Sequence, residues 1–428
     1  MKQIESLKAL SYKPYRRLFF GSTISNVGTW VETVAIGIYM QTTTGNATYV
    51  AASLAAGYIP QALMALFSGP IADKYSRKRI LITTNTCAAL IACVLTFVVA
   101  IDINKPGLII FLIFLSGFLN SIGFPAWQAF LSDIVPKEKV AGALSLMFAQ
   151  WNLGRIIGPA IAAIFVSGGH YAQALGANAA SFIVVVFMLS LIKEKHYQIE
   201  KDKRIYVQSS SKIETFFGGW RFIFSKGSHM RRPYLVFCLV IFLASPFISL
   251  IPYVADEVFK HKNLGTSLFT TFQGIGAVLV SVLMTTLHIK FGQTRTQQAF
   301  LLALPFVVAG FGIAPNLFVA TPFAFFFGIT YLGVLTSTTL SSQLAAPPQL
   351  KGRVSAAYMA TLGLLFPLSS LLQSIFVENF GARTLFVSTG LILGVLTILF
   401  GAFTKSYRLP DEYNQETKID MDKENHED

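Results

Sequence analysis

The sequence predicts an all-α membrane protein with twelve transmembrane helices in two six-helix bundles and both termini in the cytoplasm. Three observations predict it: the composition, the number of long apolar runs, and the placement of the basic residues. The 428 residues are 53% hydrophobic, with a mean hydropathy of +0.57 and only 13% charged residues. A soluble domain carries about 25% charged residues. A chain this apolar could not cover its surface with polar groups, which indicates a membrane protein.

Twelve apolar runs are long enough to cross a bilayer. A crossing helix needs about 20 residues and satisfies its own backbone polar groups in lipid. The ninth and tenth runs share a segment without charge, 296–350, and Pro315 is expected to separate them because it has no N–H to donate. The runs are residues 18–40, 48–70, 80–101, 108–130, 140–166, 171–192, 234–255, 266–287, 298–314, 317–339, 355–377 and 382–403.

The basic residues set the orientation. With the N-terminus in the cytoplasm, 29 Lys and Arg lie in cytoplasmic segments, 4 lie in outer loops, and Arg155 lies within a helix. This distribution follows the positive-inside rule. The net charge of +13 is therefore explained by topology and by attraction to anionic lipid head groups, and nucleic acid is not an expected partner. Cys87, Cys93 and Cys238 lie in apolar runs without a metal-ligand spacing, so no metal or cofactor is expected.

The longest polar segment divides the chain into two halves of six runs each. The expected domains are an N-terminal bundle (1–192), a cytoplasmic linker (193–233), a C-terminal bundle (234–403) and an acidic, disordered tail (404–428). In the linker, apolar residues at a spacing of three to four over 212–226 predict a helix in the cytoplasmic membrane interface. We interpret this helix as an anchor, with a regulatory site as the alternative. Two adjacent glycines, Gly218 and Gly219, are expected to weaken it.

A concentration of charge lies between the second and third runs, where Asp73 precedes four bases. Topology explains the bases but leaves the acid unexplained, because an acid at the membrane boundary needs a partner that offsets its desolvation. The partner is either the bases that follow it or the positive N-terminal end of the helix that begins at Arg353.

This loop resembles the loop 2–3 signature of the major facilitator superfamily, G-x-x-x-D-R/K-x-G-R-R/K, with Ser76 in place of the usual glycine. The resemblance implies a carrier whose acid latches the cytoplasmic gate between the halves. The second half keeps only part of the signature, in HIKFGQTRTQ, so the latch is expected on one side only. The candidate gate residues are Gly69, Asp73, Lys74, Arg77, Lys78 and Arg353.

The fifth run carries GRIIGPAIAA, which resembles the helix-five signature of superfamily exporters, G-x₃-G-P-x₂-G-G, at Gly154, Gly158 and Pro159. Physically, the two glycines let another helix approach closely, and Pro159 bends the helix. A longer similarity, from FPAWQAFLSDIVPKEKVAGALSL to GANAASF, is to the bacterial subgroup that contains the enterobactin exporter and macrolide-efflux proteins. This resemblance implies export.

Two charged residues lie within the apolar runs, Glu32 and Arg155. Each costs on the order of 3 kcal/mol to place in a bilayer, so such residues usually face a cavity or each other. Glu32 is the candidate for proton coupling or substrate contact. The alternatives are a static ion pair or hydrogen-bonded acid that joins the first and fifth helices, and a position at the lipid edge. Arg155 is the candidate partner of Glu32 or the group that binds an anionic cargo. Small and polar residues on the face of Glu32 are expected to line a water-accessible path: Gly21, Ser25, Gly28 and Thr29.

No nucleotide-binding motif is present in the sequence, so an ion gradient is the expected source of energy. We expect a secondary active transporter, not an enzyme, which acts as a monomer in a bacterial plasma membrane. Its expected function is export of a small amphipathic molecule, such as a drug, a macrolide or a siderophore, by proton antiport and alternating access. The alternatives are a proton-coupled uptake permease for a nutrient and a non-transporting receptor or scaffold.

Overall fold

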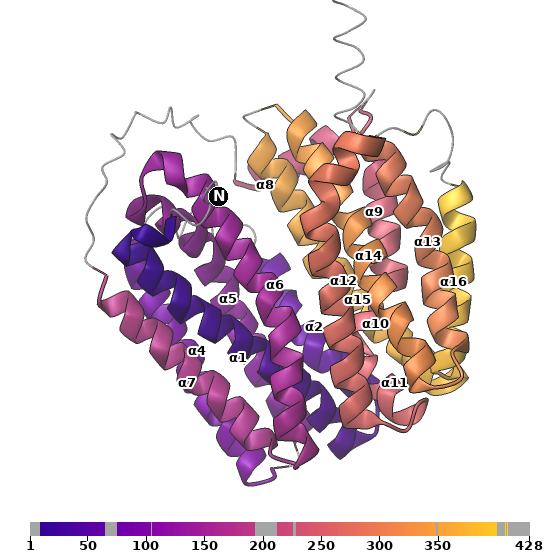
Figure 1. Ribbon diagram of the computed structural model, residues 1–428, viewed down its shortest axis with the longest axis horizontal. Helices are drawn as coiled ribbons and strands as arrows, with labels where there is room; N and C mark the ends of the chain where they lie inside the picture. The colour runs from indigo at the N-terminus through magenta and orange to yellow at the C-terminus, as the bar shows by residue number, and fades with distance from the viewer. Residues whose placement is uncertain are drawn as a thin grey trace, which may run out of the picture. The chain divides into compact units, whose positions relative to one another are not determined.

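A computed structural model of the chain describes residues 9–64, 75–103, 105–192, 212–225, 228–347 and 350–399, together with Tyr407 and Leu409. Regular structure in these residues is helical, and each of the twelve predicted runs contains helix (Figure 1). The helices are α1 (Lys13–Thr44), α2 (Ala47–Met64), α4 (Arg77–Ala100), α5 (Pro106–Ile134), α6 (Lys137–Ser167), α7 (Tyr171–Ser190), α8 (Lys212–Ile223), α9 (Arg231–Ala244), α10 (Pro246–Ser249), α11 (Ile251–Glu257), α12 (Lys262–Phe291), α13 (Gln293–Ile313), α14 (Leu317–Ala345), α15 (Lys351–Phe380) and α16 (Ala382–Leu399).

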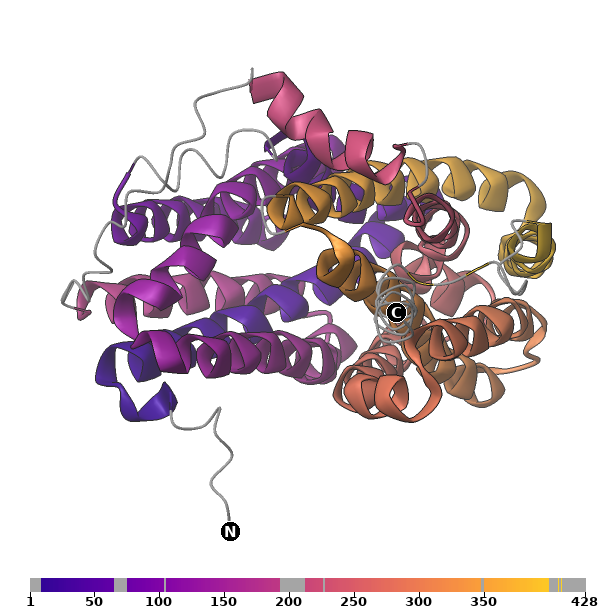
Figure 2. The ribbon, with the colours of Figure 1, turned by 90° about the horizontal axis from the view of Figure 1, so that it is seen from above.

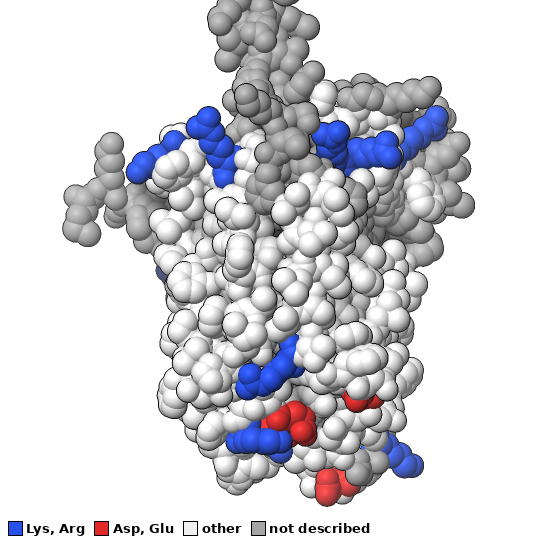
Figure 3. Space-filling model, turned by 90° about the vertical axis from the view of Figure 1, so that its right-hand side faces the viewer, with Lys and Arg blue, Asp and Glu red and all other residues white. Residues whose placement is uncertain are grey.

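The distribution of charge fits a bilayer. On the face shown in Figure 3, charged residues lie toward the two ends and a wide band between them carries almost none. Among the described residues, nine helical spans are long and apolar enough to cross a membrane. Neither α1 nor α6 is among these nine, and these two helices carry Glu32 and Arg155, the charged residues within the apolar runs.

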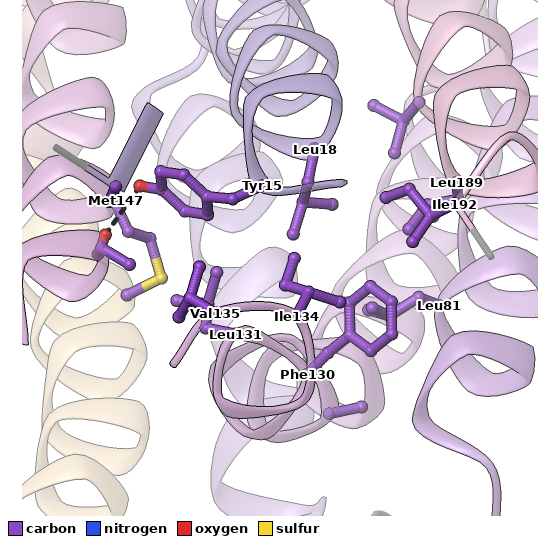
Figure 4. Packing of buried hydrophobic residues seen from close by; sticks show 14 of the residues in the cluster. Tyr15, Leu18, Leu81, Phe130, Leu131, Ile134, Val135, Met147, Leu189 and Ile192 are labelled. Atoms are coloured by element: carbon purple, nitrogen blue, oxygen red, sulfur yellow. Dashed lines mark hydrogen bonds between the residues drawn. The ribbon is translucent and has the colours of Figure 1, made fainter. Parts of the chain in front are cut away.

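The chain forms two compact units, of which unit 1 comprises Met1–Gln208 and Ser249–Thr271. In unit 1, α1 packs against α6 and α7, α4 packs against α5 and α7, and α2 packs against α5. One core of unit 1 lies around Tyr15, whose hydroxyl donates a hydrogen bond to the Ala143 carbonyl over 2.9 Å (Figure 4). Leu18, Phe130 and Leu189 pack in the same core. This core fixes the helices that carry the charged residues.

Two basic residues hold the C-terminal end of α7. Arg17 donates a hydrogen bond to the Leu191 carbonyl over 2.7 Å, and Lys78 donates one to the Ile192 carbonyl over 2.6 Å. The last carbonyls of a helix lack intrahelical donors and carry partial negative charge, so cations stabilise them. Lys78, which the sequence assigned to the gate and to topology, therefore also joins α4 to the end of α7.

The seventh run, 234–255, was predicted as one helix, and this was wrong: it forms α9, α10 and α11. Prolines cause the breaks. Pro246 has no N–H to donate to the carbonyl of Phe242, four residues earlier. Ser369 and Gln373 of α15 donate to that carbonyl instead, Gln373 over 2.5 Å. The boundary between the two units falls in this broken segment, between Ile248 and Ser249.

The segment after the break packs in unit 1, against α1. Pro252 of α11 fits against Gly37, where a Cβ atom would lie 2.9 Å from the proline ring. Gln41 donates a hydrogen bond to Asp256 over 3.2 Å, and Lys262 lies 3.9 Å from the same carboxylate. A glycine and a proline therefore define where α11 contacts α1, and a polar group strengthens the contact one turn later.

Unit 2 comprises Ser209–Ile248 and Phe272–Asp428, and in it α13 packs against α14 and α16. The predicted break at Pro315 is present: α13 ends at Ile313 and α14 begins at Leu317. Asn316 caps α14 by accepting a hydrogen bond from the Val319 N–H over 3.0 Å. An asparagine in this position satisfies one of the N–H groups that a helix start leaves without a partner.

Helix α8 packs against α15 in unit 2 (Figure 2). The adjacent glycines of α8 were expected to weaken it, but they form its contact surface. A Cβ atom on Gly219 would lie 2.8 Å from the carbonyl carbon of Arg353, and one on Gly218 would lie 3.2 Å from the Arg353 side chain. Trp220 donates a hydrogen bond to the Tyr234 hydroxyl over 2.5 Å. The glycines thus bring α8 close to α15, and this contact offsets their low helix propensity.

Two residues of the segment expected to form the disordered tail are buried in unit 2. The Tyr407 hydroxyl donates a hydrogen bond to Gln297 over 2.8 Å, and the Leu409 N–H donates one to Thr294 over 2.8 Å. Both acceptors lie in the first turns of α13. Apart from these two residues, the acidic tail lies outside the described residues.

Candidate functional site

Glu32 lies in α1 and contacts α7. One carboxylate oxygen of Glu32 accepts a hydrogen bond from the side-chain amide of Asn178 over 2.7 Å. The approach depends on Gly28, one turn earlier, where a Cβ atom would lie 2.7 Å from the Asn178 oxygen and 2.8 Å from the Ser181 hydroxyl. Only glycine lets α7 come this close, and the close approach positions the amide at the carboxylate.

The expectation that this face of α1 lines a water-accessible path was wrong for three of its four residues. Gly21, Ser25 and Gly28 are buried, and α1 packs against α7 along this side. A Cβ atom on Gly21 would lie 3.2 Å from the side chain of Met188. Small residues permit tight helix packing as readily as they line an aqueous path, and here they pack.

Arg155 of α6 lies against α1. Its guanidinium carbon is 5.4 Å from the centre of the Trp30 ring, within the range of a cation–π interaction. The guanidinium also interacts electrostatically with the hydroxyl of Tyr58 in α2. The contact with Trp30 therefore joins α6 to α1 at Arg155.

The two glycines of the exporter-like motif, Gly154 and Gly158 in α6, pack against Trp30 of α1. A Cβ atom on Gly158 would lie 3.2 Å from the Trp30 backbone and closer still to its Cβ. One on Gly154 would lie 2.9 Å from the Asn26 amide carbon and 3.0 Å from the Trp30 ring. The glycines were predicted to let another helix approach closely, and the helix that does so is α1. Because the glycines contact Trp30, they fix the position of the ring that Arg155 lies against.

Pro159 lies inside α6, which continues through it from Lys137 to Ser167. A proline at this position cannot donate the intrahelical bond to the carbonyl four residues earlier, which is the carbonyl of Arg155. The glycines of the motif therefore shape the face of α6 that packs against α1. Its proline leaves the backbone carbonyl of Arg155 without its usual intrahelical donor.

The structure does not pair Glu32 with Arg155. Among the described residues, no ion pair joins the two side chains. Their neighbours also differ: Glu32 contacts Asn178, whereas Arg155 lies near Trp30 and interacts electrostatically with Tyr58. Reasoning from the sequence missed all three of these neighbours. Asn178 offered a signal, as an amide within the apolar run 171–192.

At the predicted gate, Arg77 forms an ion pair with Asp133 of α5 over 2.7 Å and donates a second hydrogen bond to the Ala129 carbonyl over 3.1 Å. Both charged side chains are partly exposed. Asp133 was not predicted, although an acid at the end of an apolar run was a signal. Gly69, Asp73 and Lys74 lie outside the described residues.

Arg353, the remaining gate candidate, lies in the first turn of α15 and contacts the glycines of α8. It was expected to mark the helix end that receives Asp73. Its described neighbours belong to unit 2, so its contact with α8 is a packing role that the sequence did not indicate.

Comparisons with known proteins agree on the kind of molecule. A family described as transmembrane secretion effector matches residues 4–425. The staphyloferrin A transporter of Staphylococcus aureus is 25% identical over 92% of this chain and 97% of its own length. Macrolide efflux protein A of Streptococcus pyogenes is 21% identical over 89% of this chain and 94% of its own. The enterobactin exporter of Shigella flexneri is 31% identical over 42% of this chain and 44% of its own.

A solved structure shares the fold. A mutant of the nucleoside transporter NupG matches with a TM-score of 0.74 at 15% identity, and the match covers 92% of this chain and 100% of that one. At this identity the likeness concerns the fold alone.

Proposed function

Because the chain belongs to the transmembrane secretion effector family of the major facilitator superfamily, we propose that it exports a small organic molecule in exchange for protons. It is a multi-span transporter of the bacterial cell membrane and not an enzyme. The proposal includes twelve crossings, both termini in the cytoplasm, action as a monomer, and alternating access between the two halves of the chain. The relatives with exporter names support the direction of transport.

The proposed cargo is an anionic siderophore or a macrolide. The relatives are named for staphyloferrin A, macrolides and enterobactin. Arg155 supports an anionic cargo because it brings a positive charge into an apolar run of the first half. Guanidinium edges bind carboxylates through two parallel hydrogen bonds.

The contact between Glu32 and Asn178 carries the proposal of proton coupling. A partner amide suits an acid that gains and loses a proton, because it offers both a donor and an acceptor. The NH₂ group of Asn178 donates to the ionised carboxylate. After protonation the same amide can turn its oxygen toward the new O–H. A fixed basic partner would hold the carboxylate in its charged form instead.

The gate remains part of the proposal. Asp73, with Gly69 and Lys74, is proposed to stabilise the state closed to the cytoplasm. The ion pair of Arg77 with Asp133 supports the proposal because it holds the start of α4, just after this loop, against α5.

Transport into proteoliposomes tests the coupling. Wild-type protein with an imposed pH gradient is expected to move radiolabelled staphyloferrin A or erythromycin, while Glu32→Gln loses this movement and keeps cargo exchange without a gradient. The matched control is Glu257→Gln, which changes an exposed acid at the end of α11. Full gradient-driven transport by Glu32→Gln would refute the coupling role. Cell accumulation of either compound that rises on expression would favour uptake instead of export.

A second measurement addresses Arg155. Arg155→Ala is expected to reduce transport of the anionic siderophore at least tenfold more than that of the macrolide, and Arg155→Lys to restore part of it. Equal loss for both cargoes would assign Arg155 a structural role in joining α6 to α1.

A further inference from the structure

We infer that α8 and the first turn of α9 form a binding site for the phosphate groups of anionic membrane lipids. The site consists of Phe217, Arg221 and Phe224 with Arg231 and Arg232, and we refer to it as the basic corner. It lies at the membrane surface, because α8 directly precedes the membrane helix that begins with α9.

The inner side of α8 is fixed to unit 2. Gly219 and Ile223 are buried, and Trp220 is hydrogen-bonded to Tyr234 of α9 over 2.5 Å. The Phe224 ring meets the ring of Tyr234 edge-on, at 5.6 Å between centres. The C-terminal end of α8 therefore lies beside the first turn of α9, in a defined orientation.

Two partly exposed aromatic rings, one on α8 and one just after its end, lie on either side of one base in the sequence. Phe217 is 57% exposed, Phe224 is 44% exposed, and Arg221 between them is exposed. The spacing of four residues places Phe217 and Arg221 on one face of α8, and Phe224 follows three residues later, directly after the helix. Helices that lie in the lipid interface are rich in both basic and aromatic side chains. A soluble acidic partner would need the base but not the rings.

The first turn of α9 adds charge to this face. Arg231 and Arg232 are exposed, and the surrounding segment 193–233 contains ten bases and four acids. Guanidinium groups bind phosphate through paired hydrogen bonds, and clusters of bases next to a membrane helix attract anionic lipids. The rings would contact the upper acyl chains while the guanidinium groups contact the phosphate. This combination selects an anionic phospholipid over a zwitterionic one.

Native mass spectrometry of the full-length protein in detergent tests the site. Phosphatidylglycerol and phosphatidylcholine with identical acyl chains are titrated separately. The wild type is expected to bind phosphatidylglycerol at least fivefold more tightly, and the double variant Arg221→Gln/Arg231→Gln to lose this preference. The control Arg79→Gln/Lys290→Gln removes the same charge from exposed bases of α4 and α12 and is expected to keep it.

Two further arms separate the lipid from other anions. Phe217→Ala is expected to weaken phosphatidylglycerol binding about threefold, by loss of apolar contact alone. Soluble glycerol phosphate is expected to compete poorly. The proposal is overturned if wild-type protein binds both lipids equally, if the control variant loses as much preference as the test variant, or if glycerol phosphate displaces the lipid at similar concentration.

Discussion

Replacing Gly158 by alanine is expected to force α1 away from α6. An ideal Cβ atom at this position would lie 3.2 Å from the Trp30 backbone and closer to the Trp30 Cβ, whereas ordinary contacts begin at 3.4 Å. These atoms belong to the main chain or sit next to it, so a side-chain rotation cannot relieve the clash. The helix itself must shift, and Trp30 would move with it away from Arg155.

The size of the effect follows from two opposing terms. Overpacking of this kind costs about 1–3 kcal/mol, and the immovable neighbour favours the upper part of that range. Alanine in a helix interior recovers up to about 1 kcal/mol relative to glycine. The net destabilisation is therefore about 1–2 kcal/mol. At about 2–4 °C per kcal/mol for a unit of this size, the apparent Tm falls by about 2–8 °C.

Thermal unfolding of the purified protein in detergent measures this shift. Gly176→Ala is the matched control, because a Cβ atom on Gly176 in α7 meets only Thr96, at an ordinary 3.6 Å. That control gains helix propensity without a clash and is expected to raise the apparent Tm slightly. If Gly158→Ala proved as stable as Gly176→Ala, the inference that this glycine sets the distance between α1 and α6 would be refuted.

Three other substitutions test separate contacts. Asp133→Asn is expected to lower stability by no more than about 1 kcal/mol, because the ion pair with Arg77 is partly exposed, and a double-mutant cycle measured by Tm isolates the pair. Tyr407→Phe removes the hydroxyl that bonds Gln297, with an expected loss of about 1 kcal/mol and faster tryptic cleavage of the tail. Gly219→Ala is expected to displace α8 and change the fluorescence of its tryptophan.

Each of these has an outcome that contradicts it. An effect of Asp133→Asn that persists in the absence of Arg77 would show that the ion pair is not its source. Unchanged proteolysis of Tyr407→Phe, next to the exposed control Tyr49→Phe, would show that the hydroxyl does not hold the tail. Unchanged emission from Gly219→Ala, in a variant whose remaining tryptophan is Trp220, would show that α8 does not depend on close approach.

The positions of the helices were largely predictable, because the length and apolarity of each run are local properties of the sequence. The break at Pro315 was predictable for the same reason. The breaks at Pro246 and Pro252 were not, because prolines often occur inside continuous membrane helices. The carbonyl that Pro246 leaves without its intrahelical donor bonds instead to Ser369 and Gln373, more than a hundred residues away in sequence.

The candidate site also has a part that the sequence predicted and a part that it did not. The cost of a charge in lipid identified Glu32 and Arg155 from the sequence alone. Their neighbours Asn178 and Trp30 come from the packing of α7 and α6 on α1, which depends on where small residues permit close approach. Glycine gives the same sequence signal at a packing face and at a water-lined face. The polar side of α1 was therefore read as a path although most of it is a contact.

The two bonds at the C-terminal end of α7 limit how unit 1 deforms. Arg17 belongs to α1 and Lys78 to α4, and both donate hydrogen bonds to backbone carbonyls just after the end of α7. At mid-length the same helix presents Asn178 to Glu32. If a change in the protonation of Glu32 rotated α7, either both hydrogen bonds would have to break or α1 and α4 would have to rotate with α7. A change at one carboxyl group would then reach the far end of α7 as a joint movement of three helices.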